Sequence, residues 1–127
     1  MNTIDATTRE LLEKTEFVAI VTQGPSGPHV VGNWGDYLRR LGVEGDRIVL
    51  PAGHYNETEK NLQRDNRVQV MVASRAVKGS RAPGQGGVLS GTGTVQTEGE
   101  AAQRAKAAFP WARGALVIEV QSVKMHL

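Results

Sequence analysis

The sequence contains no cysteine, which excludes disulfide bonds, thiolate metal ligands and a cysteine nucleophile. Histidine is also scarce, and His29, His54 and His126 stand far apart without the spacing of a metal site. No apolar run approaches the roughly 18 residues needed to cross a bilayer. The segment Met1–Asp5 lacks the basic and then apolar layout of a signal peptide. We therefore expect a cytoplasmic protein without a zinc site or a membrane partner.

Charged residues nearly balance over the whole chain, with 15 lysines and arginines against 13 aspartates and glutamates. A net charge of +2 is too small to indicate nucleic-acid binding by composition. The cations are unevenly spread, however, and only Asp65 opposes a cluster made of Arg64, Arg67, Arg75, Lys78 and Arg81. This basic cluster predicts a local positive field, and its simpler interpretation is a solvated basic face.

The length of 127 residues suits a single domain, residues 1–127, with a core of its own. Apolar, β-branched runs bounded by glycine and proline predict six strands, at residues 17–22, 29–31, 46–50, 68–74, 88–97 and 115–120. Short helices are predicted at residues 7–14, 59–64 and 100–108, a turn at 39–45, and a mobile or dimer-facing loop at 75–87. Because parallel strands would need a helix between them, we expect a mainly β (β+α) fold, built as a closed antiparallel barrel.

One stretch, residues 51–62, joins a predicted strand to a predicted helix and has the features of an anion site. Asn56 is expected as the N-cap, with Glu59 three residues later in a capping-box arrangement. The free amide groups of such a helix start can bind an anion, most often a phosphate. A helix cap without any ligand is the simpler alternative for this stretch taken alone.

A second stretch, residues 32–38, combines two glycines with Trp34 and Tyr37. Aromatic rings next to glycines allow a flat ligand to approach ring and backbone together. The alternative is that both side chains are anchors of the core. The sequence does not choose between these two interpretations.

Motifs for catalysis by side chains are absent from the sequence. No serine lies in a Gly-x-Ser-x-Gly turn, and no Gly-x-Gly-x-x-Gly follows a predicted strand into a helix. A bound cofactor with its own reactivity fits the sequence better than hydrolysis by side chains. The protein would then provide the pocket, the orientation and the electrostatics.

Several short motifs along the chain resemble one known family. They are Asn33-Trp34, Tyr37-Leu38, Thr58-Glu59, Trp111-Ala112-Arg113 and the terminal Leu127. These motifs resemble the small FMN-binding proteins of sulfate-reducing bacteria, within the pyridoxamine 5′-phosphate oxidase-like split-barrel superfamily. The resemblance covers nearly the whole chain. It implies a six-stranded antiparallel split β-barrel with small flanking helices, which binds FMN between the two subunits of a homodimer.

The resemblance also implies which residues contact the flavin. Asn33, Trp34 and Tyr37 match the segment that lies against it, with Trp34 and Tyr37 as ring contacts. Trp111 matches a second tryptophan near the isoalloxazine. Leu127 matches a C-terminal leucine that reaches the flavin of the other subunit.

At the phosphate end, Thr58 matches a hydroxyl that binds the phosphate, next to the expected cap Asn56. Glu57 stands where the family has a lysine, and Asn33 where it has a threonine. A carboxylate beside a doubly charged phosphate weakens binding because the interaction changes sign. The basic residues that could compensate are Lys60, Arg75, Lys78 and Arg81, of which Arg75 is the first choice because it follows a strand end.

The sequence therefore predicts a homodimeric FMN-binding flavoprotein. It would act in electron transfer, or as a small flavin-dependent oxidoreductase or flavin reductase served by NAD(P)H or a redox partner protein. A split barrel that binds F420, FAD or haem is the alternative, motivated by Glu57. A more remote alternative is a barrel that binds nucleic acid through residues 75–81, with Trp34 and Tyr37 stacking on bases. No catalytic acid or base is assigned.

Overall fold

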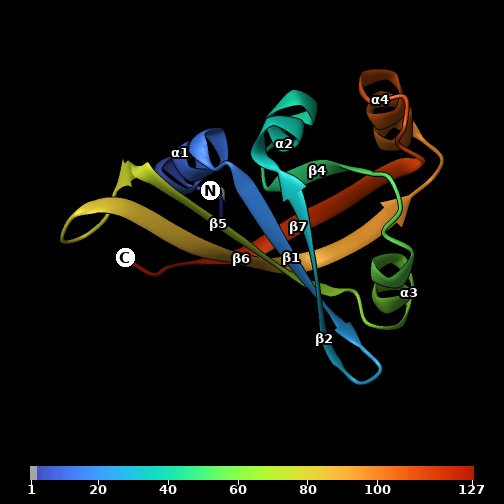
Figure 1. The fold of residues 1–127 in the computed structure, drawn as a ribbon, viewed down its shortest axis with the longest axis horizontal. Coiled ribbons are helices and arrows are strands. Elements are labelled where there is room, and N and C mark those ends of the chain that lie inside the picture. Colours follow the sequence, from blue (N-terminus) through green and yellow to red (C-terminus); the bar gives the residue numbers. More distant parts are fainter. Residues whose placement is uncertain (1–2) are drawn as a thin grey trace.

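The computed structural model describes residues 3–127, which form seven strands and four helices (Figure 1). Met1 and Asn2, which begin the predicted domain and the segment inspected for a signal peptide, lie outside the described residues. The strands are β1 (Phe17–Gly24), β2 (Gly27–Trp34), β3 (Val43–Glu44), β4 (Arg47–Ala52), β5 (Arg67–Lys78), β6 (Pro83–Gln96) and β7 (Gly114–Met125). The helices are α1 (Ala6–Lys14), α2 (Gly35–Leu41), α3 (Asn56–Arg64) and α4 (Glu100–Ala108).

All seven strands belong to one antiparallel sheet in the order β2-β1-β5-β6-β7-β4-β3. The predicted mainly β, antiparallel class is confirmed. The expected six strands and closed barrel are wrong, because residues 3–127 form seven strands and no ladder in this range joins β2 to the far end of the sheet. The additional strand, β3, pairs only Val43 and Glu44 with the start of β4. Two residues are too few to show an alternating pattern in the sequence.

Helix α2 was not predicted, and its last residues, 39–41, fall in the segment predicted as a turn. Gly35 begins this helix, and a Cβ atom at that position would collide with the carbonyl oxygen of Thr15. Arg39, from the middle of α2, donates a hydrogen bond to the same oxygen at 2.8 Å. Gly35 is therefore a packing glycine that lets α2 approach the end of α1, and not a helix breaker.

Helix α1 begins close to the predicted residue but has a different cap. Asp5 accepts a hydrogen bond from the Thr8 amide at 2.9 Å and is the N-cap, so the helix starts at Ala6 and not at the predicted residue 7. This bond and a second one from the Thr8 hydroxyl lower the pKa of Asp5. Leu11 and Leu12 are fully buried beneath the helix. The short helix is thus part of the core.

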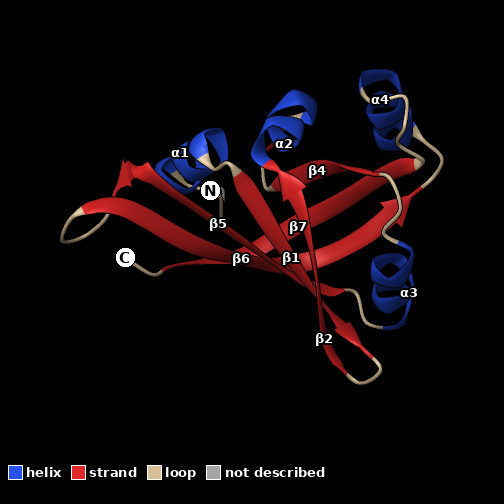
Figure 2. Cartoon of the chain, viewed as in Figure 1, coloured by secondary structure: helices blue, strands red, loops and turns tan. Residues whose placement is uncertain are grey.

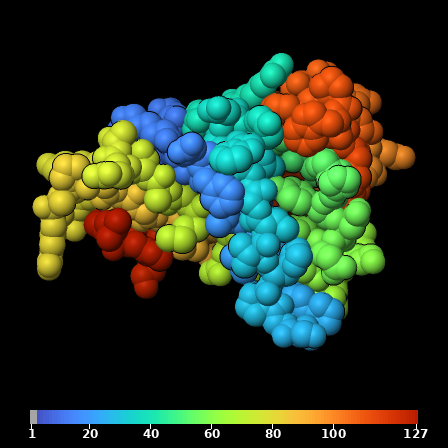
Figure 3. Space-filling model, in the orientation of Figure 1, coloured from blue at the N-terminus to red at the C-terminus, as the bar shows by residue number. Residues whose placement is uncertain are grey.

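The largest departure from prediction lies between β5 and β6. β5 continues to Lys78 and β6 starts at Pro83, so only residues 79–82 of the expected loop 75–87 connect the strands. A register shift after Ser74 marks an irregularity in this hairpin. Backbone pairing along the ladder outweighs the glycine content that suggested a loop. The hairpin projects at the end of the molecule opposite α3 (Figures 1 and 3).

One face of the sheet carries the main core. Ile20 of β1 lies opposite Val70 of β5, which lies opposite Leu89 of β6, and all three side chains are buried. Helices α1, α2 and α4 line one side of the sheet in the view of Figure 2. No helix within residues 3–127 has both the length and the apolar character to cross a membrane.

Side chains, instead of a backbone ladder, connect β2 to the second half of β4. The Asn33 amide donates to the Pro51 carbonyl oxygen at 3.1 Å and to the Tyr55 hydroxyl at 2.9 Å. The Tyr55 hydroxyl donates in turn to the Gly32 carbonyl oxygen at 2.8 Å. We call Asn33, Tyr55 and these two carbonyl groups the seam. Burial raises the pKa of Tyr55 to about 12, so its hydroxyl remains a donor at neutral pH.

Replacing Tyr55 by phenylalanine removes one donor from Gly32 and one acceptor from Asn33. We expect the free energy of unfolding, measured by urea denaturation at neutral pH, to fall by about 1–3 kcal/mol. The difference from the wild type is fully present below a pH of about 10, where tyrosine is protonated in the unfolded chain. It is lost as the pH rises toward about 12, because ionisation favours the unfolded chain before the folded one.

Tyr37→Phe is the matched control, because Tyr37 is the other tyrosine and its hydroxyl lies outside the seam. We expect a change of less than about 0.5 kcal/mol for this variant. A Tyr55→Phe variant as stable as the wild type would show that the seam does not hold the two strands together.

Candidate functional site

The start of α3 is organised differently from the prediction. Tyr55 occupies the N-cap position with a left-handed backbone (φ 53°), and its side chain enters the seam instead of capping the helix. Asn56 is the first helical residue, so the expected cap and capping box are wrong. The physical reason is the seam, because the bonds to Asn33 and Gly32 hold the Tyr55 ring and the backbone adopts the conformation that they require.

This arrangement leaves unused hydrogen-bonding groups in the first turn of α3. The amide of Glu59 donates to the Tyr55 carbonyl oxygen at 2.8 Å, and the amides before it have no acceptor in the helix itself. Thr58 is fully buried, and its Oγ1 atom has no hydrogen-bond partner within residues 3–127. A buried hydroxyl without a partner destabilises a protein by about 1–3 kcal/mol. Donors of this kind at a helix start suit an oxyanion such as a phosphate.

Other unsatisfied polar atoms surround the same helix. Within residues 3–127, the residues with a buried, unpartnered side-chain nitrogen or oxygen are His29, Thr58, Arg104 and Arg113. His29 lines a small cavity of about 220 Å³ together with residues of α3. Arg113 forms an ion pair with Glu59 of α3 at 2.8 Å. Three of these four residues therefore lie in or against α3.

An aromatic cluster lies beside the loop that leads into α3. The Tyr37 ring centroid is 4.7 Å from that of Phe109 and 5.7 Å from that of Trp111. The Trp111 ring covers Gly53, where an added Cβ atom would lie 3.2 Å from the ring. Trp111 itself remains 53% exposed. The structure thus brings two predicted flavin contacts, Tyr37 and Trp111, next to the predicted anion site.

Trp34 and Asn33 lie at the seam. Trp34 is 51% exposed and packs edge-on against Phe17, with 5.8 Å between ring centroids. Asn33 uses its amide nitrogen for two hydrogen bonds in the seam, and its Oδ1 accepts one from the Trp34 amide at 2.8 Å. Asn33 therefore joins the two strands and positions Trp34, and it has little capacity left for a ligand.

Two of the predicted site residues lie at the opposite end of the molecule. Arg75 is on the distal half of β5, roughly 25 Å along the strand from Arg67 beside α3. Leu127 is 63% exposed, and its amide and its main-chain oxygen are both held by the Gln85 side chain, at 2.8 Å and 2.6 Å. Glu57, in contrast, is exposed in the first turn of α3. Within a single chain, therefore, neither Arg75 nor Leu127 lies near α3.

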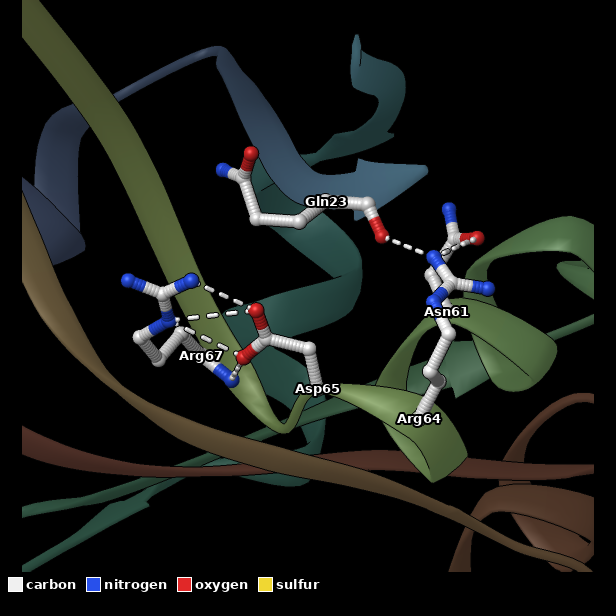
Figure 4. Close-up of polar contacts among 5 residues, drawn as sticks. All are labelled: Gln23, Asn61, Arg64, Asp65 and Arg67. Atoms are coloured by element: carbon white, nitrogen blue, oxygen red, sulfur yellow. Dashed lines mark hydrogen bonds and ion pairs between the residues drawn. The ribbon is translucent and has the colours of Figure 1, made fainter. Parts of the chain in front are cut away.

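Two cations of the basic cluster are engaged at the C-terminal end of α3 (Figure 4). Arg64 donates to the Gln23 carbonyl oxygen at 2.6 Å and to Asn61 Oδ1 at 3.4 Å. Arg67 pairs with Asp65 at 2.6 Å, and its hydrogen bonds lower the pKa of Asp65 to about 2. Arg64 and Arg67 therefore lie at the connection from α3 to β5, at the other end of the helix from the predicted anion site.

Arg113 is a cation near α3 that the sequence reading did not single out. It belongs to the Trp111-Ala112-Arg113 motif just before β7. Its approach to α3 depends on the ladder between β4 and β7, which places Ala52 opposite Gly114. In the sequence, only its position beside Trp111 indicated that Arg113 could lie near the site.

Comparisons with known proteins find relatives that cover almost the whole chain. The family model described as pyridoxamine 5′-phosphate oxidase matches residues 4–126. A protein of Nitratidesulfovibrio vulgaris named FMN-binding protein is 44% identical over 118 residues, which are 93% of this chain and 94% of that protein.

Solved structures share the fold at low sequence identity. HupZ from Group A Streptococcus matches with a TM-score of 0.71 and 17% identity, over 93% of this chain and 92% of that chain. A haem-binding protein from Mycobacterium smegmatis matches with a TM-score of 0.68 and 20% identity, over 94% of this chain and 52% of that chain. Such likenesses establish the architecture and not the ligand.

The resemblance drawn from the sequence motifs is confirmed at the level of the family. The family model covers nearly every described residue, and the 44% identical relative extends over almost the full length of both proteins. This chain belongs to the pyridoxamine 5′-phosphate oxidase family.

Proposed function

We propose that this chain is a single-domain flavoprotein that binds FMN, with the phosphate at the start of α3. The observation that carries the proposal is the buried Thr58 hydroxyl, which lacks a partner in the first turn of α3 and suits a phosphate oxygen. The 44% identical relative named FMN-binding protein supports the choice of ligand.

The residues present fit the ring system and the phosphate of this cofactor. Trp111 and Trp34 offer exposed indole rings for the flavin ring system, and Tyr37 holds Trp111 in place from within the aromatic cluster. Thr58 would donate its hydroxyl hydrogen to the phosphate, and the free amides of Asn56 and Glu57 would add to the positive end of the helix. Arg75 and Leu127 would reach a flavin only from a second copy of the chain.

When bound, FMN supplies the capacity to accept electrons or a hydride, which no side chain of the protein has. The protein itself binds the ring, holds the phosphate and limits the access of water to the flavin. We infer a role in electron transfer, or in a small flavin-dependent oxidation and reduction with NAD(P)H or a redox protein as partner. Both roles need the same site.

We propose that the protein is a homodimer, joined through an apolar outer patch. Phe17 lies opposite Trp34 in the ladder, Ala19 lies opposite Met71, and Val30 lies four residues from Trp34 on the same face of β2. Phe17, Trp34, Met71 and Val30 are the large apolar members of this face, and all are exposed. Exposed apolar patches of this kind commonly mark protein interfaces. Because Trp34 belongs to both the patch and the flavin site, a second copy would cover the flavin.

A different cofactor, such as haem, FAD or F420, is the second candidate. Glu57 favours it, because an exposed carboxylate in the first turn of α3 opposes a phosphate at that place. A structural relative described as haem-binding shows that the fold itself accommodates more than one ligand. The absorption spectrum of the purified protein and the mass of the extracted ligand separate these cofactors.

The Thr58→Val variant tests the phosphate site with two measurements, the affinity for FMN, which should fall, and the stability of the free protein, which should not. We expect the affinity for FMN to fall about tenfold, because one hydrogen bond to a charged group is lost, while the affinity for riboflavin, which lacks the phosphate, stays unchanged. The free energy of unfolding of the free protein should stay equal or rise, since an unpartnered buried hydroxyl is removed. Fluorescence quenching and urea denaturation measure the two effects.

Thr94→Val, at an exposed strand position, is the control for Thr58→Val. Equal losses for FMN and riboflavin would contradict the assignment.

Glu57→Lys reverses the charge next to the proposed phosphate. We expect FMN to bind about three to ten times more tightly at low salt, and riboflavin to bind as before. Glu13→Lys, an exposed helical glutamate of α1, is the matched control and should leave both affinities unchanged. Unchanged or weaker FMN binding to Glu57→Lys would mean that the phosphate lies elsewhere.

Met71→Lys places a charge in the middle of the apolar outer patch. We expect the wild type to sediment as a dimer and this variant as a monomer at micromolar concentration, because an unpaired charge is costly in an apolar interface. Thr94→Lys adds the same charge at an exposed position outside the patch and should leave the dimer intact. A Met71→Lys variant that stays dimeric would place the interface on another face.

A further inference from the structure

Arg113 is held against the start of α3 from two sides. Its backbone amide donates to the Ala52 carbonyl oxygen at 2.9 Å, and its Nε atom donates to the His54 carbonyl oxygen at 2.7 Å. His54 directly precedes Tyr55, the N-cap residue of α3. The guanidinium group is thus fixed one residue away from the helix start, which orients it before any ligand arrives.

The outer part of the same guanidinium group has unused donor capacity. Its Nη2 atom is buried and lies 2.8 Å from Glu59 Oε1, but without the direction of a hydrogen bond. Arg113 and Glu59 are both mostly buried, with 31% and 25% of their side chains exposed. A buried arginine nitrogen whose only charged neighbour is poorly aligned can take a better acceptor.

We propose that Arg113 selects a phosphorylated ligand at the start of α3, and that Glu59 is the counter-ion that it releases when the phosphate binds. This inference rests on the proposed function, because it assigns the recognition of the flavin phosphate to a residue at that same site. Arginine suits the task because its planar guanidinium group can give two parallel hydrogen bonds to phosphate oxygens.

The other cations near the helix are less suited to this task. Arg64 and Arg67 are committed at the C-terminal end of α3, to Gln23 and Asp65. Lys60 is exposed on the helix, where solvent screens its charge. Arg113 therefore supplies the positive charge that offsets Glu57.

Because the first turn of α3 contains two acidic residues, Arg113 must release Glu59 before it can bind the phosphate. Glu57 and Glu59 both oppose a phosphate, whereas only Glu59 is paired with Arg113. While this ion pair is intact, Arg113 is bound to Glu59 and is not available to the phosphate. Removing the Glu59 charge should therefore increase the preference for a phosphorylated ligand.

The test is the ratio of FMN affinity to riboflavin affinity, measured by fluorescence quenching for the full chain and its variants. Arg113→Gln should lower this ratio at least about tenfold by weakening FMN alone, and Arg113→Lys should recover part of it. Glu59→Gln should raise the ratio about threefold. Arg47→Gln is the matched control, because Arg47 also forms an ion pair with a glutamate, Glu119, at 2.8 Å, but lies on β4.

The results separate this inference from the proposed function. If the wild type binds neither flavin, the proposed function fails, and Arg113 has no phosphate to recognise. If the wild type prefers FMN but Arg113→Gln weakens both flavins equally, Arg113 only holds the loop and the inference is overturned. If Arg113→Gln does not fold, the Glu59→Gln variant tests the inference instead. A ratio of FMN to riboflavin affinity that is unchanged or lower in Glu59→Gln also overturns the inference.

Discussion

The hydrogen bonds of the Tyr55 hydroxyl are the interaction on which the rest of this structure depends. The sheet is open, and residues 3–127 provide no backbone ladder between β2 and β4. Tyr55 and Asn33 replace that ladder with three side-chain hydrogen bonds. Because a buried hydroxyl and amide are costly when unpaired, each bond makes the others necessary. The strand edges are therefore held at a fixed separation without being fused into a closed barrel.

The same seam shapes the candidate site. The side chain of Tyr55 faces the seam and does not cap α3, its backbone takes a left-handed conformation, and the helix starts at Asn56 without a side-chain cap. The first-turn amides and the Thr58 hydroxyl are then left without side-chain acceptors in the helix start. Trp34 is positioned by Asn33 on the other side of the seam. The connection between the two sheet edges and the conformation at the start of α3 thus depend on one set of contacts.

Family membership narrows the chemistry but leaves the ligand to the site. Proteins with this fold include one named for FMN and one described as haem-binding, so the architecture alone does not select a cofactor. The features that can select are local to this chain. They are the buried hydroxyl of Thr58, the exposed ring of Trp111, and the ion pair between Arg113 and Glu59.

Sequence patterns alone were sufficient for the β1–β2 hairpin, for α4, for the mainly β class and for the family. Strands such as residues 115–120 alternate or run apolar, and α4 is rich in alanine, so local propensity and final structure agree there. A helix close to residue 56 could also be predicted, but its expected cap, Asn56, is not the cap. Gly35 and the glycines of residues 75–87 misled the prediction, since glycine marks both turns and close packing.

Only the tertiary structure decided which polar groups are satisfied and which cation lies against the start of α3. Arg113 is 54 positions away from Glu59, and the β4–β7 ladder, formed over residues 47–52 and 114–119, brings them together. The sequence by itself determined the strands, the family and the residue types of the site, because these follow from local pattern and motif. The seam, the unpartnered Thr58 hydroxyl and the reach of Arg113 depend on distances across the folded sheet, which no local pattern encodes.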